Sequence, residues 1–261
     1  MYLELKVLGL FRIKPENRSI RKVGSGCHNK VLSNLRVAEI FASIQGEGIW
    51  TGIPSTFVRA SGCNLRCRWC DTPYASWNPE GPVMPIAAIL EEIARLGMPH
   101  VVLTGGEPML FDAMEELAQG CREQGRTITI ETAGTIYREI ACDLMSISPK
   151  LAHSTPDDPT WGPRHERERL KPDVLQRLID EYEYQLKFVV NPEQGDDFAE
   201  IEALLSELSG VHPQRVLIMP EGVDAATLHR RGRMLVEPCM ARGWRLSPRM
   251  HIDLFGDTRG T

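Results

Sequence analysis

Residues 61–72 read SGCNLRCRWCDT, and three of the seven cysteines in the chain fall within this stretch. Their spacing is C-x3-C-x2-C, and Trp69 directly precedes the last cysteine. A disulfide framework would instead use an even number of dispersed cysteines. Three thiolates on one loop can hold three irons of a cubane cluster and leave the fourth iron open, whereas electron-transfer clusters are normally closed by four cysteines. An open iron is a place where a substrate or cofactor binds.

A zinc knuckle is the alternative interpretation of these three cysteines. Structural zinc sites usually take four ligands, arranged as two separated pairs. No fourth ligand is obvious here, because the nearest later histidine is His100. The cluster is favoured because motifs further along the chain also fit it. The other four cysteines are scattered, and we interpret them as buried or incidental thiols: Cys27, Cys121, Cys142 and Cys239.

Length and composition indicate a globular protein. The chain has 261 residues, of which 42% are hydrophobic and 25% are charged, as is ordinary for one large domain or two small ones. A net charge of −5 gives no support for a nucleic-acid or membrane surface. Free thiols in this number predict a reducing compartment, and hence the cytoplasm. Residues 1–10 lack a basic lead and a cleavage site, so we expect no signal peptide.

The domain organisation is predicted to be an N-terminal extension, residues 1–34, followed by a core domain, residues 35–261. Residues 12–30 are basic, rich in Ser, Gly and Asn, and aperiodic, so we expect the extension to be poorly ordered.

Strand-like and helical patterns alternate through the core, which predicts an α/β fold with a parallel sheet and right-handed crossovers. Residues 151–171 are interpreted as a long loop and a possible lid, and residues 248–261 as a tail. Polar or glycine residues recur at the carboxyl ends of strands, where a barrel keeps its active site. The predicted strands are 37–42, 56–60, 101–103, 127–131, 144–148, 185–190, 216–219 and 244–247. The predicted helices are 84–96, 110–124, 172–182, 197–208 and 224–242.

The C-x3-C-x-aromatic-C pattern resembles the radical S-adenosylmethionine enzymes, in which the amino acid end of that cofactor chelates the open iron. Four further motifs make the chain from about residue 35 onward resemble the 7-carboxy-7-deazaguanine synthases. Phe255 stands where that family pattern has tryptophan, which is a mild departure. The motifs are SIQGEG at 43–48, FVR at 57–59, CDT at 70–72 and HIDLFG at 251–256.

The resemblance implies a fold, a reaction and partners. The fold would be an incomplete, partial TIM-type barrel of parallel strands with outer helices, with fewer than eight strands, in a homodimer. The reaction would be ring contraction of 6-carboxy-5,6,7,8-tetrahydropterin to 7-carboxy-7-deazaguanine with release of ammonia, in queuosine and deazapurine biosynthesis. It would require a 4Fe-4S cluster, S-adenosyl-L-methionine, Mg2+ and an electron donor such as flavodoxin or ferredoxin.

The resemblance also assigns roles residue by residue. Arg59 would form a planar, bidentate pair with the pterin carboxylate, and the terminal carboxylate of Thr261 would meet the pterin amine edge. The cluster ligands would be Cys63, Cys67 and Cys70, and the magnesium ligand Thr72. The other substrate contacts would be Ile44, Gln45, Gly46, Glu47, Thr104 and His251. The cofactor contacts would be Gly105, Gly106, Glu107, Ser148, Pro149, Lys150, Met219, Pro220, Glu221 and Gly222.

Several residues have a purely structural alternative. Arg59 could pair with a carboxylate of the core, Glu47 could cap a turn, and Thr72 could be an N-cap. His251 could simply be packed in the tail. At the level of the whole protein, the alternatives are a glycyl-radical-enzyme activating enzyme and a non-catalytic zinc or iron–sulfur binding module.

Overall fold

The structure is a computed structural model that describes residues 33–261. The predicted N-terminal extension lies outside the described residues, apart from Ser33 and Asn34, and it stays a prediction. The first strand begins at Asn34, one residue before the predicted start of the core.

The described residues form one sheet of nine strands in the order β3-β1-β2-β4-β5-β6-β7-β8-β9. β1 pairs antiparallel with β2 and with β3, and every later neighbour pair is parallel. The strands are β1 (Asn34–Ile44), β2 (Pro54–Ala60), β3 (Val83–Pro85), β4 (His100–Gly105), β5 (Thr127–Thr132), β6 (Leu144–Ile147), β7 (Tyr184–Val190), β8 (Val216–Pro220) and β9 (Arg245–Leu246).

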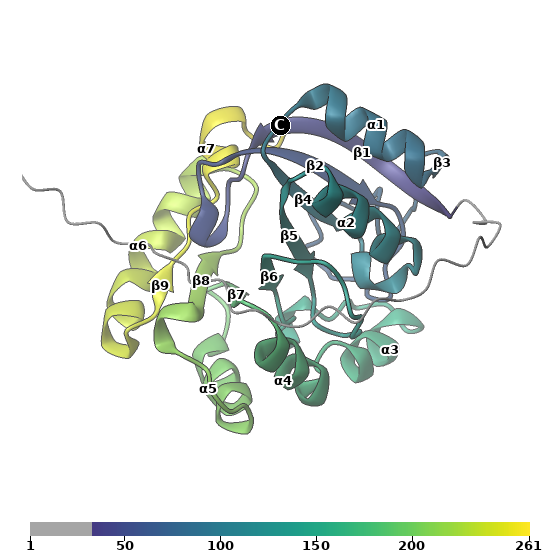
Figure 1. Ribbon diagram of the computed structural model, residues 1–261. Coiled ribbons are helices and arrows are strands. Elements are labelled where there is room, and N and C mark those ends of the chain that lie inside the picture. The colour runs from purple at the N-terminus through teal and green to yellow at the C-terminus, as the bar shows by residue number, and fades with distance from the viewer. Residues whose placement is uncertain (1–32) are drawn as a thin grey trace, which may run out of the picture. The chain divides into compact units, whose positions relative to one another are not determined.

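The described part of the chain has seven helices, six of them between strands and α7 after the last strand. Figure 1 shows the longer ones along the outside of a curved, unclosed sheet. The helices are α1 (Ile86–Leu96), α2 (Ala113–Glu123), α3 (Trp161–Glu168), α4 (Pro172–Glu181), α5 (Asp197–Glu207), α6 (Ala225–Arg242) and α7 (Met250–Phe255). Short 3-10 turns occur at Gly48–Trp50, Pro108–Leu110, Ala152–Ser154 and Pro213–Arg215.

The prediction of an α/β partial barrel is confirmed, but three of its details differ. The sheet has nine strands rather than fewer than eight, because β1 and β3 add an antiparallel edge to the parallel run. The predicted loop 151–171 contains α3, and the predicted tail 248–261 contains α7. Neither helix carries a long apolar stripe, so the sequence pattern did not reveal them.

The core lies between the sheet and the outer helices. α1 buries Ile86, Ile89 and Ile93, which share one face because they are three or four positions apart. The helix ends at Gly97, whose φ of 75° is the left-handed conformation that suits glycine at a helix C-terminus. β7 is buried along its whole length, as is typical of a strand covered on both faces. None of the described helices is long and apolar enough to cross a membrane.

Candidate active site

A row of polar side chains crosses the sheet near the carboxyl ends of the parallel strands. Arg59 of β2 lies opposite Glu39 of β1 and Thr104 of β4. Further along, Glu131 of β5 lies opposite Ser146 of β6. All five side chains line one cavity of about 480 Å3. The sheet therefore brings to one place residues that are far apart in sequence, at the edge where barrel enzymes bind their ligands.

The cysteine loop follows β2 and forms one wall of this cavity. Cys63, Cys67 and Cys70 all line it and carry free thiols. Among residues 33–261, no three His, Cys, Asp or Glu side chains gather as they would around a single metal ion. A cubane cluster makes a different demand, because each thiolate binds a different iron. Three free thiols on one loop that lines a cavity suit such a cluster.

Burial raises the pKa of the Cys63 and Cys67 thiols to about 12. Both thiols are therefore protonated near neutral pH in the protein without a metal. Because a metal binds the thiolate, loading such a site releases protons.

Residues 151–171, the segment predicted as a loop or lid, form hydrogen bonds with the cysteine loop. The backbone N–H of Arg66 donates to Nδ1 of His165 in α3 at 3.1 Å, and the Arg68 N–H donates to the Ser154 carbonyl at 2.8 Å. Burial lowers the pKa of His165 to about 4, so this ring is neutral and can accept the bond. In the described structure, residues 151–171 therefore pack against the cysteine loop and support it, in place of the predicted lid.

The glycine turn after β4 lies against the cysteine loop. A Cβ atom on Gly106 would stand 2.1 Å from the Gly62 carbonyl oxygen, and one on Gly105 would stand 2.2 Å from the Ala60 oxygen. Only glycine allows this close approach. The Gly106 N–H already donates to the Ala60 carbonyl at 3.0 Å, so its approach to a ligand would be through the exposed backbone surface rather than through a free N–H.

The predicted cofactor contacts divide into two groups. Those that line the cavity are Gly105, Gly106, Ser148, Lys150 and Met219. Those that do not line it are Glu107, Pro149, Pro220, Glu221 and Gly222.

Glu107, one of the residues that do not line the cavity, has a clear structural role. Its buried carboxylate accepts hydrogen bonds from the Met109 N–H, the Thr132 hydroxyl and the Ala133 N–H at 2.8–3.0 Å. These bonds bind the turn after β4 to the end of β5, so Glu107 has a structural role.

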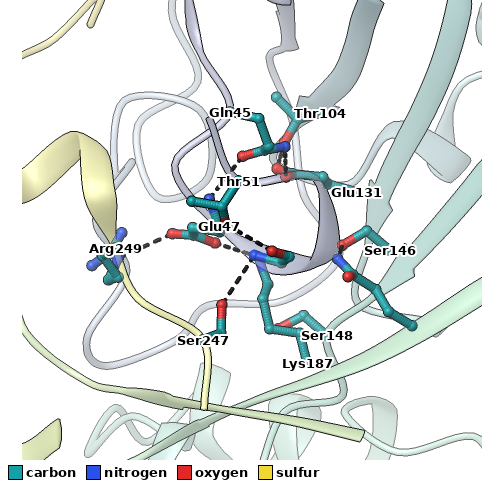
Figure 2. Close-up of polar contacts among 12 residues, drawn as sticks. Gln45, Glu47, Thr51, Thr104, Glu131, Ser146, Ser148, Lys187, Ser247 and Arg249 are labelled. Atoms are coloured by element: carbon teal, nitrogen blue, oxygen red, sulfur yellow. Dashed lines mark hydrogen bonds and ion pairs between the residues drawn. The ribbon is translucent and has the colours of Figure 1, made fainter. Parts of the chain in front are cut away.

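Glu131 is an acidic residue of the cavity lining that sequence patterns did not single out. Its two oxygens accept bonds from the Gln45 side-chain amide at 3.1 Å and from the Thr104 hydroxyl at 3.0 Å (Figure 2). Gln45 and Thr104 are predicted substrate contacts, and both line the cavity as expected. A carboxylate oxygen can accept more than one hydrogen bond, so Glu131 can also accept from N–H groups of a ligand.

A second centre is a buried ionic network around Glu47. Lys187 of β7 donates to one oxygen, and Arg249 donates to the other at 3.0 Å (Figure 2). Arg249 also contacts Asp71 in the cysteine loop and donates to the Gly222 carbonyl at 2.6 Å. Burial alone would raise the pKa of Glu47, but the charges of Lys187 and Arg249 hold that pKa far below its usual value.

The remaining predicted substrate contacts also line the cavity. The Met250 N–H donates to the Gly46 carbonyl at 2.8 Å, and a Cβ atom at Gly46 would stand 2.1 Å from Nδ1 of His251. Position 46 therefore needs glycine so that α7 can lie against the turn that follows β1. Ile44 and Thr261 lie on the same cavity surface.

Arg59 is held by Glu39, which was the structural alternative considered for it. The Arg59 Nε atom lies 2.5 Å from Glu39 Oε1. Within residues 33–261, Glu39 is the only hydrogen-bond partner of the Arg59 side chain, so both terminal amino groups of Arg59 lack such a bond to the described protein. Arg59 also lines the cavity. The two interpretations are compatible, because Glu39 fixes one edge of the guanidinium and the other edge remains for a ligand.

Glu47→Gln should strongly destabilise the fold. Removing this charge leaves Lys187 and Arg249 buried without their partner, at a cost of about 3–5 kcal/mol. Urea unfolding at pH 7 measures the loss in the free energy of unfolding. The control is Glu92→Gln, which breaks an exposed pair with Arg95 and should change that free energy little. The folded-state pKa of Glu47 is depressed. Its ionised form therefore stabilises the fold fully above the unfolded-state pKa, and this stabilisation is lost as the pH falls. The stability difference between variant and wild type should shrink below about pH 4. An unchanged urea midpoint at pH 7 would contradict the network.

Comparison with known proteins agrees with this geometry. Residues 57–160 match the Radical SAM superfamily. This matched stretch includes the cysteine loop and the glycine turn after β4. The chain is thus a radical S-adenosylmethionine enzyme, a class that carries a 4Fe-4S cluster and uses S-adenosylmethionine.

Relatives that align with most of the chain identify the family within this enzyme class. The chain is 42% identical to a 7-carboxy-7-deazaguanine synthase of Rhodopirellula baltica, over 88% of this chain and 90% of the relative. It is 41% identical to the synthase of Halobacterium salinarum, over 87% and 93%. The crystal structure of QueE from Escherichia coli superposes with a TM-score of 0.63 at 27% identity, covering 84% of this chain and 95% of that one. The chain belongs to the 7-carboxy-7-deazaguanine synthase family.

Proposed function

We propose that this enzyme converts 6-carboxy-5,6,7,8-tetrahydropterin to 7-carboxy-7-deazaguanine with release of ammonia, in queuosine or deazapurine biosynthesis. Family membership supports the proposal. The observation that carries it is a single cavity with three cysteine thiols on one wall and the Arg59 guanidinium and Glu131 carboxylate on other walls.

The cluster would be held by Cys63, Cys67 and Cys70, and S-adenosylmethionine would lie beside it. When bound, these groups supply a 5'-deoxyadenosyl radical that takes hydrogen from the substrate. The chain itself supplies placement and exclusion of water. The proposed cofactor contacts that line the cavity are Gly105, Gly106, Ser148, Lys150 and Met219. The others would act from the same strand ends: Glu107, Pro149, Pro220, Glu221 and Gly222.

The pterin would be recognised at two edges. The Arg59 amino groups suit its carboxylate, because a guanidinium binds a carboxylate through two parallel hydrogen bonds. The Glu131 carboxylate, held by Gln45 and Thr104, suits the amino and ring N–H donors of the pterin. Ile44, Gly46, Glu47, His251 and Thr261 would complete the pocket.

Thr72 is the proposed magnesium ligand. Its hydroxyl lies 3.8 Å from the Cys70 sulfur and borders the cavity, and a hydroxyl oxygen suits this hard cation, which keeps other positions for water and substrate oxygens. Thr72→Ala should slow turnover at least about tenfold at unchanged iron content. Thr72→Ser retains the hydroxyl and should keep most activity. Loss of iron in Thr72→Ala would show that Thr72 is structural instead.

Partners and compartment follow the same proposal. The enzyme would act as a homodimer in the cytoplasm and receive electrons from flavodoxin or ferredoxin. Free thiols around an iron–sulfur site fit a reducing compartment. The alternative of a glycyl-radical activating enzyme has less support, because the relatives described above are synthases over most of their length.

The test is a conversion assay with the anaerobically reconstituted enzyme. We expect deazapurine product to form only when the carboxylated tetrahydropterin, S-adenosylmethionine and a reductant are all present. Cleavage of S-adenosylmethionine without any conversion of this pterin would leave the enzyme class intact and overturn the substrate.

A further inference from the structure

The last five residues, 257–261, form a closing segment that borders the cavity. Arg259 is its one anchor to the rest of the described chain. Its two amino groups donate to Glu80 at 2.5 Å and to the Ala38 carbonyl at 3.0 Å, and its Nε donates to Glu39 at 3.3 Å. The guanidinium also lies over the Tyr74 ring, 4.0 Å from its centre.

The other side-chain bonds of the closing segment are local. The Thr258 hydroxyl donates to the Phe255 carbonyl and the Thr261 hydroxyl donates to the Thr258 carbonyl, both at 2.7 Å. Gly256 and Gly260 have φ values of 69° and 82°, which allow the chain to turn at either end of Arg259. Within residues 33–261, the position of the segment therefore depends on one side chain.

Glu39 is shared between this anchor and the cavity. One oxygen accepts from Arg59 at 2.5 Å and from the Tyr74 hydroxyl at 2.8 Å, while the other accepts from Arg259. Its side chain is only 11% exposed, and its three hydrogen-bond donors fix both of its oxygens. One carboxylate thus orients the arginine that faces the cavity and also holds the segment that borders it.

We propose that Arg259 is a positioning residue that fixes the closing segment as a wall of the substrate pocket through Glu39. This inference rests on the proposed function for the identity of the substrate. Because Glu39 holds both arginines, closure of the segment and orientation of Arg59 reinforce each other. Arg259 and Glu80 are about half exposed, so each ion pair is weak alone, and the position depends on the sum of several contacts.

Three variants separate the contacts. Arg259→Ala removes all contacts of the anchor. Glu80→Ala removes one contact of Arg259 and leaves Arg59 unchanged. Glu39→Gln weakens the ion pairs of both Arg59 and Arg259. Arg95→Ala removes an exposed ion pair on α1 and is the matched control. Backbone order parameters of residues 257–261 are measured by NMR relaxation in the full chain. KM and kcat are measured for pterin and S-adenosylmethionine after reconstitution.

The expected result is graded. Arg259→Ala should lower the backbone order parameters of the closing segment and raise the pterin KM by about tenfold, while the KM for S-adenosylmethionine and the iron content stay near wild type. Glu80→Ala should show a smaller version of both changes. Glu39→Gln should raise the pterin KM further than Arg259→Ala, because it also releases Arg59. The Arg95→Ala protein should match wild type.

Two results would overturn the inference. One is unchanged order parameters of the closing segment in Arg259→Ala. The other is lower order parameters with an unchanged pterin KM, which would make the anchor structural only. Failure of the proposed function looks different: the wild type would not convert the pterin, and the order parameters would still decide whether Arg259 holds the segment.

Discussion

We expect the Cys67→Ala protein to assemble no stable cluster and to release no 5'-deoxyadenosine. Wild-type protein reconstituted without oxygen should bind about four irons per chain. Three thiolates on one short loop leave no spare ligand, so loss of the buried central one removes an iron position altogether. Iron analysis, the visible absorption spectrum and product analysis measure the outcome.

The control for Cys67→Ala is Cys121→Ala. Cys121 is buried in α2 and does not border the cavity, so this variant should take up iron normally. Circular dichroism of both variants checks that each is folded. Full iron uptake by Cys67→Ala, or stoichiometric zinc in place of iron in the wild type, would refute the assignment of the loop.

The second large effect is expected from Arg59→Ala. Removing one partner of an enclosed, charge-assisted pair costs about 2–5 kcal/mol, which corresponds to a fall of about 30- to 3000-fold in pterin turnover. Slow cleavage of S-adenosylmethionine without substrate should survive, because the cysteine loop is untouched. Both products, 5'-deoxyadenosine and the deazapurine, are measured.

Arg59→Lys provides the sharper comparison. It keeps a positive charge but loses the planar fork and the Nε–H group that Glu39 fixes, so only part of the activity should return. Unchanged pterin turnover in Arg59→Ala would show that Arg59 only forms an ion pair with Glu39. That outcome would support the structural alternative for this residue.

The strands and most helices were predictable because their apolar patterns are local. β7 and β8, for example, are short apolar runs between turn residues. α3 was not predictable in this way: its sequence WGPRHERE has little apolar periodicity. It begins where the Asp158 carboxylate accepts from the N–H groups of Thr160 and Trp161 at 2.9 and 2.7 Å, which substitutes for a regular cap.

The candidate site was predictable where residues cluster in short motifs, as in the cysteine loop and the turn that contains Gln45. It was not predictable where partners are remote. Lys187 and Arg249 meet Glu47 from 140 and 202 positions away, and only the strand register places Glu39 opposite Arg59. A charged residue within an otherwise apolar strand, such as Lys187, was the one signal available.

These separations also bear on the order in which the site assembles. The Arg66 end of the cysteine loop needs only His165 of α3, 99 positions later. The Asp71 end of the same loop needs Arg249, 178 positions later. Glu47 and Glu39 need Arg249 and Arg259, 202 and 220 positions away. Chain closure over longer separations costs more entropy, and domains fold from the N-terminal side during synthesis. The first support of the metal-binding loop can therefore form while the chain is still being made, whereas the substrate side needs α7 and the closing segment to reach the first two strands.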